Sequence, residues 1–435
     1  MKNIIILSAT FFLLSNLACK KNKTEPPITP AALKKQFGGN GFDNLADFKK
    51  MADGGFVLAG TTTSTDGDGT GNHGLSDGLV IRTNATGTII WKKVYGGTGQ
   101  DVFNSVVIAP DGNIVVSGYC KSTDGDIIGN HGLYDYVAMK LSSADGAILW
   151  SVSYGGTADD YCNGMVQLAD GSLLLSGYTN SNNGDILLNR GNGDIWVLKL
   201  KNTGDIIWSK TFGGTSFDIG TSIIRLANDE IAVLGYTGST DGDVTGNHGG
   251  PSDVWLLKLS SNGTLMSQKC YGGSGQENPS ALVELSDGSV AIAGLTNSTD
   301  GDAAGASLGA IDAWVLKTNA AGTVLWQKKY GGSQGEKFDV LTVLPDGSLA
   351  AGGYTESNDN NVSGNHGGID AWYLKLNSAS GAIISSKLFG GTGDDYMNRL
   401  LPSANKVLKL ILTNSNDGDF TTSRGVYDAW LIDLD

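Results

Sequence analysis

The sequence is poor in proline and cysteine, with 8 and 4 residues in 435, but it contains 64 glycines. With so little proline and 40% apolar residues, it matches neither a collagen-like nor a disordered composition. We therefore interpret the glycines as sites of tight turns in a folded protein, since glycine adopts turn conformations without steric cost.

Basic residues are also scarce. Lysine and arginine total 30 against 44 acidic residues, for a net charge of −14. Residues 1–35 carry six lysines and one glutamate, so the rest of the chain is more acidic than the total suggests. Such a body repels phosphate backbones, which argues against nucleic acid as a partner and favours cations or basic surfaces.

The sequence has no apolar run long enough for a transmembrane helix near its start. Ile4–Leu14 follows Lys2 and forms the short apolar region of an export signal. Ser15–Cys19 resembles a bacterial lipoprotein box, with Asn16 where an aliphatic residue is usual. This resemblance implies a signal peptide over 1–18, a lipid on Cys19 and a polar tether over 19–31. An ordinary cleaved signal with an incidental cysteine is the alternative.

Three cysteines remain beyond Cys19, and an odd number cannot form a complete set of intramolecular disulfides. Cys120 ends one expected strand, and Cys162 begins the inner strand of the next repeat, on the same face. A disulfide between Cys120 and Cys162 and a pair of free buried thiols both remain open, and we favour the thiols.

A repeat fills most of the chain. An aromatic residue followed by Gly-Gly recurs every 58 or 59 residues, at Phe37, Tyr95, Tyr154, Phe212, Tyr271, Tyr330 and Phe389. This period is typical of a four-stranded propeller blade with one long loop.

Each copy contains four strand-like runs between turn signals. In the second copy these are Ser105–Ala109, Asn113–Tyr119, Tyr136–Leu141 and Ile148–Tyr154. The runs are rich in valine, isoleucine and leucine, as expected for strands that are buried between neighbouring blades.

The two ends of the repeat region complement each other. The last copy stops at its third strand, Trp430–Leu434, whereas Ala32–Phe37 resembles the fourth strand of other copies. We predict an all-β fold: one seven-bladed β-propeller of four-stranded antiparallel blades over 32–435. The N-terminal strand would complete the last blade and close the ring, leaving no open sheet edge.

Two resemblances follow from these motifs. The repeats over 37–435 resemble the Tyr-Gly-Gly repeat lipoproteins of the Gram-negative envelope. The Gly-x-x-x-Trp spacing at Gly87/Trp91, Gly146/Trp150, Gly204/Trp208 and Gly322/Trp326 resembles the quinoprotein dehydrogenase-like propeller superfamily, in which this tryptophan docks blades. Ser267 and Ser385 replace it in two copies, and adjacent cysteines of the kind found in quinone-binding members are absent.

Acidic residues concentrate on one expected face, which carries the Gly-Gly turns and the long loops. One acid follows each first glycine by five residues and is expected at the mouth of the central channel: Asp43, Asp101, Asp160, Asp218, Glu277, Glu336 and Asp395. Another precedes each third strand: Asp77, Asp135, Asp194, Asp253, Asp312, Asp370 and Asp428. This face is the expected place for function, because its loops are long enough to carry it.

Some of the long loops have the spacing of a calcium loop, with acids at positions 1, 3 and 12 and glycine at 6. The candidate ligands are Asp66, Asp68 and Asp77, then Asp124, Asp126 and Asp135, and, in a loop one residue longer, Asp241, Asp243 and Asp253. Position 5 is not acidic, and position 12 is Asp rather than Glu. Turn structure built by Asp, Asn and Gly is the favoured interpretation, and a calcium site is the alternative.

Catalytic motifs are weak. The four histidines, His73, His131, His248 and His366, all lie in Gly-Asn-His-Gly, on separate blades that cannot converge on one zinc ion. There is no Gly-x-Ser-x-Gly motif, and the even repetition of polar residues marks out no single site. Paired carboxylates for glycoside hydrolysis stay open, because the expected channel mouth offers several.

These features favour a non-catalytic envelope lipoprotein. It would be monomeric, attached to the outer membrane of a Gram-negative bacterium on the periplasmic or cell-surface side, and would bind a protein or glycan through its acidic loop face. The alternative is a carbohydrate-active or carbohydrate-binding propeller. That function requires exposed aromatic residues in a cleft, whereas Trp91 and Trp196 lie at expected core positions.

Overall fold

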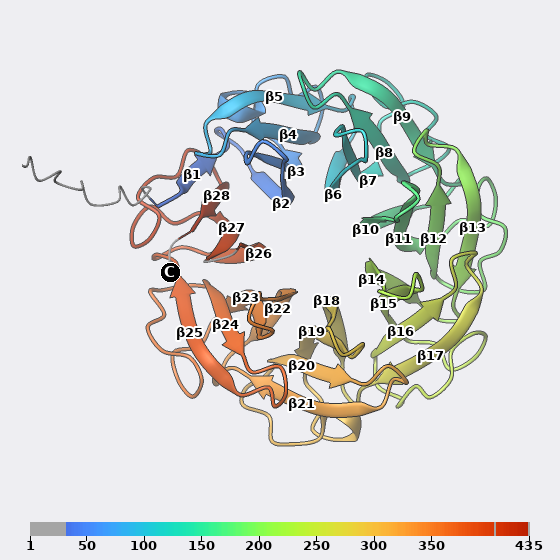
Figure 1. Cartoon of the computed structure of the whole chain (residues 1–435), viewed down its shortest axis with the longest axis vertical. Coiled ribbons are helices and arrows are strands. Elements are labelled where there is room, and N and C mark those ends of the chain that lie inside the picture. Colours follow the sequence, from blue (N-terminus) through green and yellow to red (C-terminus); the bar gives the residue numbers. More distant parts are fainter. Residues whose placement is uncertain (1–31, 404–405, 434–435) are drawn as a thin grey trace, which may run out of the picture. The chain divides into compact units, whose positions relative to one another are not determined.

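A computed structural model of the chain describes residues 32–403 and 406–433. Leu33–Asp435 is one compact unit. In its described part, seven four-stranded antiparallel sheets surround a common centre (Figure 1). The fold is therefore the seven-bladed β-propeller that the repeat predicted.

The expected signal peptide, the tether and Cys19 lie outside the described residues. Within the described ranges, no helix has the length and apolar character needed to cross a membrane.

Each blade begins at the centre of the ring and ends at its rim (Figure 1). The innermost strands are β2 (Asp43–Lys50), β6 (Asp101–Ile108), β10 (Asp160–Gln167), β14 (Asp218–Arg225), β18 (Glu277–Glu284), β22 (Glu336–Val343) and β26 (Asp395–Pro402). The second strands are β3 (Phe56–Thr62), β7 (Ile114–Cys120), β11 (Leu173–Thr179), β15 (Ile231–Thr237), β19 (Val290–Thr296), β23 (Leu349–Thr355) and β27 (Val407–Thr413).

The third strands are β4 (Asp77–Thr83), β8 (Asp135–Leu141), β12 (Asp194–Leu200), β16 (Asp253–Leu259), β20 (Asp312–Thr318), β24 (Asp370–Leu376) and β28 (Asp428–Ile432). The outer strands are β5 (Ile89–Tyr95), β9 (Ile148–Tyr154), β13 (Ile206–Phe212), β17 (Leu265–Tyr271), β21 (Val324–Tyr330), β25 (Ile383–Phe389) and β1 (Lys34–Phe37). Blade 1 comprises β2–β5, blades 2 to 6 follow in chain order, and blade 7 comprises β26, β27, β28 and β1. Two long loops contain a short 3-10 turn, at Gly67–Gly69 and Gly301–Ala303.

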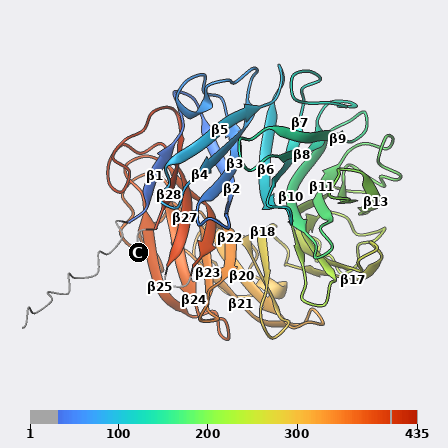
Figure 2. The same ribbon diagram turned by 45° about the horizontal axis from the view of Figure 1, so that its top comes forward.

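The N-terminal strand closes the ring as predicted. β1 pairs antiparallel with β28, with Lys34 opposite Ile432 and Phe37 opposite Ala429. Figure 2 shows β1 beside β28 from a second direction. Blade 7 thereby gains its fourth strand from the opposite end of the repeat region.

The apolar core lies between blades rather than inside one sheet. The cluster between blades 2 and 3 joins Val115 and Ala138 to Leu175 and Leu198, all with no exposed surface. Both faces of the second and third strands are buried in this way, which explains their near-continuous apolar sequences.

Most strand boundaries differ from the sequence-based expectation by at most two residues, and one differs by more. The inner strand of the second copy was predicted over Ser105–Ala109, but β6 begins at Asp101 and contains a register shift between Phe103 and Ser105. The extra residue of a bulge interrupts the period-2 pattern, and this hid the first half of the strand.

Tryptophan and tyrosine on the outer strands of blades 1 to 5 dock each of these blades onto the next. The Nε1–H of Trp91 donates to the Ser143 carbonyl at 3.1 Å, and the Tyr95 hydroxyl donates to the Gly146 carbonyl at 2.6 Å. Gly146 has φ of +71°, and a Cβ there would lie 2.9 Å from the Trp91 ring. Trp150, Trp208 and Trp326 donate equivalent bonds. The docking role implied by the superfamily resemblance is confirmed.

Candidate functional site

The acids expected at the channel mouth begin the innermost strands, but they are not exposed. All seven have 0% exposure: Asp43, Asp101, Asp160, Asp218, Glu277, Glu336 and Asp395. In blade 3, Asp160 Oδ2 accepts hydrogen bonds from the Gly156 N–H at 2.8 Å and the Ser181 hydroxyl at 2.9 Å, while the Thr179 hydroxyl donates to Oδ1. These carboxylates hold the Gly-Gly turns in place.

The acids that begin the third strands are also fully buried: Asp77, Asp135, Asp194, Asp253, Asp312, Asp370 and Asp428. Asp135 Oδ2 accepts hydrogen bonds from the His131 backbone N–H at 2.7 Å and from its ring Nδ1 at 2.8 Å. The other histidines bond the corresponding acids in the same way. In two other blades Arg190 and Arg424 donate their backbone N–H, and the Arg190 guanidinium also forms an ion pair with Asp194 at 3.9 Å. The histidines therefore have a structural role in the loops.

The two sets of acids meet at the first glycine in six of the seven turns: Gly38, Gly96, Gly155, Gly213, Gly272 and Gly390. A Cβ on Gly155 would lie 2.5 Å from Asp135 Oδ1 and 2.8 Å from Asp160 Oδ2, so only glycine fits there. Among the described residues, Asp135 Oδ1 has no hydrogen-bond donor. Burial raises the pKa of Asp135, and it raises that of Asp160 to about 6.

The loops with calcium-like spacing are held by hydrogen bonds from the backbone. Asp124 Oδ1 accepts a bond from the Thr98 N–H at 2.8 Å, and Asp66 and Asp241 accept equivalent bonds from Asn40 and Thr215. Asp68, Asp126 and Asp243 accept bonds from the first glycine of the neighbouring turn. Across residues 32–403 and 406–433, no three His, Cys, Asp or Glu side chains are placed to hold a metal ion.

The prediction that these two sets of acids form an accessible acidic face is therefore wrong. Its fourteen strand-initiating acids are inaccessible, because the sequence places each one where a turn needs an acceptor for buried N–H and O–H groups. Several long-loop carboxylates, such as Asp124 and Asp241, remain exposed.

The cysteines beyond Cys19 are free and buried. Cys120 contacts the Ser153 hydroxyl at 3.5 Å, and Cys162 contacts the Ser117 hydroxyl at 3.9 Å. Burial raises the pKa of each thiol, including Cys270, to about 12. These groups stay protonated at neutral pH and are unsuited to nucleophilic attack.

Aromatic side chains gather where the long loops meet the inner strands. The tyrosine cluster of blades 2 and 3 comprises Tyr119, Tyr134, Tyr161 and Tyr178, all partly exposed. Tyr161 lies at the centre: its ring centroid is 4.8 Å from that of Tyr119, 4.9 Å from Tyr134 and 5.2 Å from Tyr178. Lys121 Nζ lies 5.2 Å from the centroid of Tyr134. The cluster forms one continuous aromatic surface across two blades.

A second group lies across blades 6, 7 and 1. This aromatic cluster comprises Tyr354, Tyr396, Tyr427 and Phe42, also partly exposed. Tyr396 lies 5.5 Å from Tyr354 and 6.5 Å from Tyr427, and Tyr427 lies 5.6 Å from Phe42, between ring centroids. The corresponding positions of blade 5 are Asn278 on the inner strand β18 and Leu295 on the second strand β19. The aromatic surface thus breaks the sevenfold symmetry.

Sequence reasoning missed both clusters. Their members flank the acids that begin strands, as in Asp160-Tyr161 and Tyr134-Asp135, or stand one residue before the end of a second strand, as in Tyr178-Thr179. Comparison of these columns between repeats could have revealed the pattern. The contacts between rings of different blades could not be predicted from the sequence of a single repeat.

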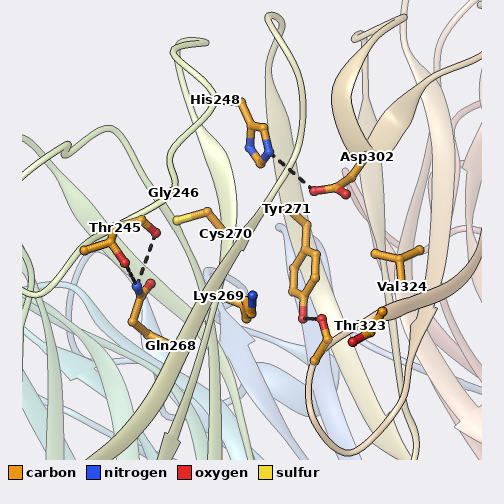
Figure 3. Close-up of a pocket in the computed structure, with 11 residues that line it drawn as sticks. Thr245, Gly246, His248, Gln268, Lys269, Cys270, Tyr271, Asp302, Thr323 and Val324 are labelled. Carbon is orange, nitrogen blue, oxygen red and sulfur yellow. Dashed lines mark hydrogen bonds and ion pairs between the residues drawn. The ribbon is translucent and has the colours of Figure 1, made fainter.

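A cavity of about 520 Å³ lies at the outer side of the junction between blades 4 and 5. Lys269 and Tyr271 of β17 line it, together with Gly322 and Thr323 of the next blade. Figure 3 shows His248 and Asp302 above these residues, where the His248 ring Nε2 lies 3.5 Å from a carboxylate oxygen of Asp302, between the loops of the two blades. This junction is one of the two at which serine replaces the docking tryptophan.

No family model matches the chain. A curated relative, the regulatory protein FlaEY of Caulobacter vibrioides, is 29% identical over 221 residues, which cover 47% of this chain and 23% of that protein. The chain therefore matches under a quarter of that relative's length.

Several solved structures resemble the propeller at low identity. BamB from Moraxella catarrhalis is 16% identical, with a TM-score of 0.43 and coverage of 91% of this chain and 85% of that one. The Neurospora crassa Pan2 WD40 domain is 9% identical, with a TM-score of 0.49 and coverage of 92% and 96%. A quinohemoprotein alcohol dehydrogenase from Comamonas testosteroni is 10% identical, with a TM-score of 0.41 and coverage of 87% and 65%. These likenesses do not bear on function.

Proposed function

We propose that this protein is a non-catalytic binding propeller that engages a polypeptide partner through its two aromatic clusters. The observation that carries this proposal is the continuous contact of Tyr119, Tyr134, Tyr161 and Tyr178 across a blade junction, with every ring partly exposed. Tyrosine is enriched at the energetic centres of protein interfaces, because its rigid ring buries much area at a small entropic cost.

The electrostatics of the clusters favour recognition by hydrogen bonds. Burial and neighbouring acids raise the pKa of Tyr178 and Tyr427 to about 12. These phenols therefore remain hydroxyls, which donate and accept hydrogen bonds at neutral pH. Exposed loop carboxylates such as Asp124 and Asp241 lie on the same loop-bearing face, so the proposed partner carries basic residues beside its apolar contact.

The burial of the thiols and the hydrogen bonds of the histidine rings support a non-catalytic role. The three described thiols are buried with raised pKa values, and each histidine ring bonds a buried aspartate at the start of a third strand. The carboxylates expected at the channel mouth, which glycoside hydrolysis would need, are buried in the turns. Measurable turnover of a polysaccharide would contradict this part of the proposal.

Site-specific photo-crosslinking in the intact envelope tests the binding surface. A photoreactive phenylalanine analogue would replace Tyr134 or Tyr396, and a control would place it at exposed Thr203, in the turn between β12 and β13. We expect protein adducts from both cluster positions and none from Thr203. Equal adducts at all three positions, or glycan as the captured species, would overturn the proposed polypeptide surface.

We also propose that the propeller is held at the outer membrane by a lipid on Cys19. The lipoprotein-like sequence before this cysteine supports the attachment. A Cys19→Ser variant should lose palmitate labelling and leave the membrane fraction, and labelling that persists in the variant would contradict the anchor.

A further inference from the structure

The junction between blades 4 and 5 lacks a side chain that four other junctions possess. Trp91, Trp150, Trp208 and Trp326 are partly buried against the following blade, and each donates its indole N–H to a backbone carbonyl there. Ser267 occupies this position in blade 4 and is exposed. The cavity of about 520 Å³ lies at this junction.

The receiving turn keeps the form of the turns that hold an indole. Gly322 has φ of +82°, as Gly263 has +79° beneath Trp208. A Cβ on Gly263 would lie 3.2 Å from both the Trp208 ring and the Lys210 stem, whereas around Gly322 the nearest atoms belong to Lys269 and Tyr271 and no indole is among them. The turn at Gly322 thus keeps the lysine stem that also lies on Gly263, but it lacks the ring.

The carbonyl that would receive an indole is also in place. Trp208 donates to Ser261, two residues before Gly263, and Ala320 stands two residues before Gly322. The Ala320 carbonyl accepts a hydrogen bond from Lys258 Nζ. Ser261 accepts from both Lys199 and Trp208, so one carbonyl can serve a lysine and an indole together.

We propose that this cavity binds the tryptophan side chain of a partner polypeptide, with its indole over Gly322 and its N–H donating to the Ala320 carbonyl. The other blades indicate that the occupant is tryptophan, because four junctions of this propeller hold an indole ring on the equivalent glycine turn. His248 and Asp302 stand at the opening, where they contact residues that flank the incoming tryptophan (Figure 3). The site is separate from the aromatic clusters.

The gap between blades 6 and 7 provides a matched comparison. Ser385 also replaces tryptophan there, and a cavity of about 280 Å³ opens beside it. Its lining is Tyr373, Phe389, Val407 and Lys409 with neighbouring serines and a lysine, and it includes no glycine turn. We expect no indole specificity at this second gap.

Calorimetric titration of the full chain with N-acetyl-tryptophanamide tests the site. We expect one binding site that saturates below about 10 mM, and no heat of binding with N-acetyl-leucinamide. Ser267→Trp should abolish the binding and raise Tm by about 2 °C, because it restores the missing contact. Ser385→Trp should leave the titration unchanged.

A second indole site, created by substitution at another junction, tests the proposal independently. Trp208→Ser reproduces the arrangement of Ser267 at the junction of blades 3 and 4, so it should lower Tm and raise the stoichiometry from one to two. The proposal is overturned if the wild-type chain does not bind N-acetyl-tryptophanamide, or if Ser267→Trp still binds it.

Discussion

The ring of Tyr134 in blade 2 stacks on the ring of Tyr161 in blade 3, with centroids 4.9 Å apart and planes inclined by 30°. Tyr134 precedes a third strand and Tyr161 follows the first residue of an inner strand, so neither blade contains the contact alone. The Tyr134 hydroxyl also donates to Gln100 Oε1 at 2.8 Å, which fixes the ring from its own blade. The surface is thus ordered before any partner arrives, which limits the entropy lost on binding.

Loss of one buried turn acid should weaken the whole ring. Asp160→Ala leaves the Gly156 N–H and the Thr179 and Ser181 hydroxyls without their acceptor. We expect a loss of about 3 kcal/mol in the free energy of unfolding, measured by urea denaturation, because buried unpaired donors are costly. Asp205→Ala is the control, since 65% of that side chain is exposed, and it should change stability by less than about 0.5 kcal/mol. Equal effects of the two substitutions would contradict the turn network.

Stability should fall as pH rises through the range set by the buried acids. Burial raises the pKa of Asp194 to about 6. A carboxyl whose pKa is raised by folding contributes its full stability below its unfolded pKa of about 4, and this contribution is lost as pH rises through 6.

Asp194→Asn isolates this effect, because asparagine keeps an oxygen acceptor for the Arg190 N–H and does not ionise. The variant should therefore lose less Tm than the wild type between pH 4 and pH 8. Parallel Tm curves for the two proteins would rule out Asp194 as a source of the pH dependence.

Calcium should leave the thermal stability unchanged. The aspartates with calcium-like spacing accept backbone N–H groups, as Asp124 does from Thr98 and Asp66 from Asn40. A ligand that binds only the native state raises Tm. Scanning calorimetry in millimolar Ca²⁺ and in EDTA should give the same Tm, and a rise in Ca²⁺ that EDTA reverses would show that these loops bind the ion.

Closure of the ring should depend on β1. A chain that begins at Gly38 lacks the partner of β28 and exposes the edge that Phe37 and Gln36 now cover. We expect this truncation to lower Tm by more than 10 °C or to aggregate, since an unpaired strand edge recruits other chains. Addition of a peptide spanning 32–37 should partly restore Tm, and an unchanged Tm after truncation would contradict closure.

The sequence predicted the architecture because each blade repeats its own signals. The spacing of the marker at Tyr95 and Tyr154 fixed the blade length, and the match between Ala32–Phe37 and other fourth strands predicted closure. The accessibility of the acids could not be predicted in the same way. In the sequence, Asp101 follows a glycine-rich turn, a context typical of solvated acids, and its burial arises only when the turn folds over it. The aromatic clusters depend on contacts between blades, which a single repeat does not contain.

The central claim is that the aromatic clusters form a partner-binding surface. The most direct measurement is the affinity of the crosslinked partner for the purified Tyr134→Ala/Tyr161→Ala double variant, compared with wild type by calorimetry. Ile207→Ala is the control, because this outer-strand side chain is 47% exposed and lies outside both clusters. We predict at least a thirtyfold loss of affinity for the double variant, as expected from the removal of interface anchors worth about 2 kcal/mol, and less than a twofold change for the control. An affinity within twofold of wild type in a double variant that keeps its Tm would contradict the account.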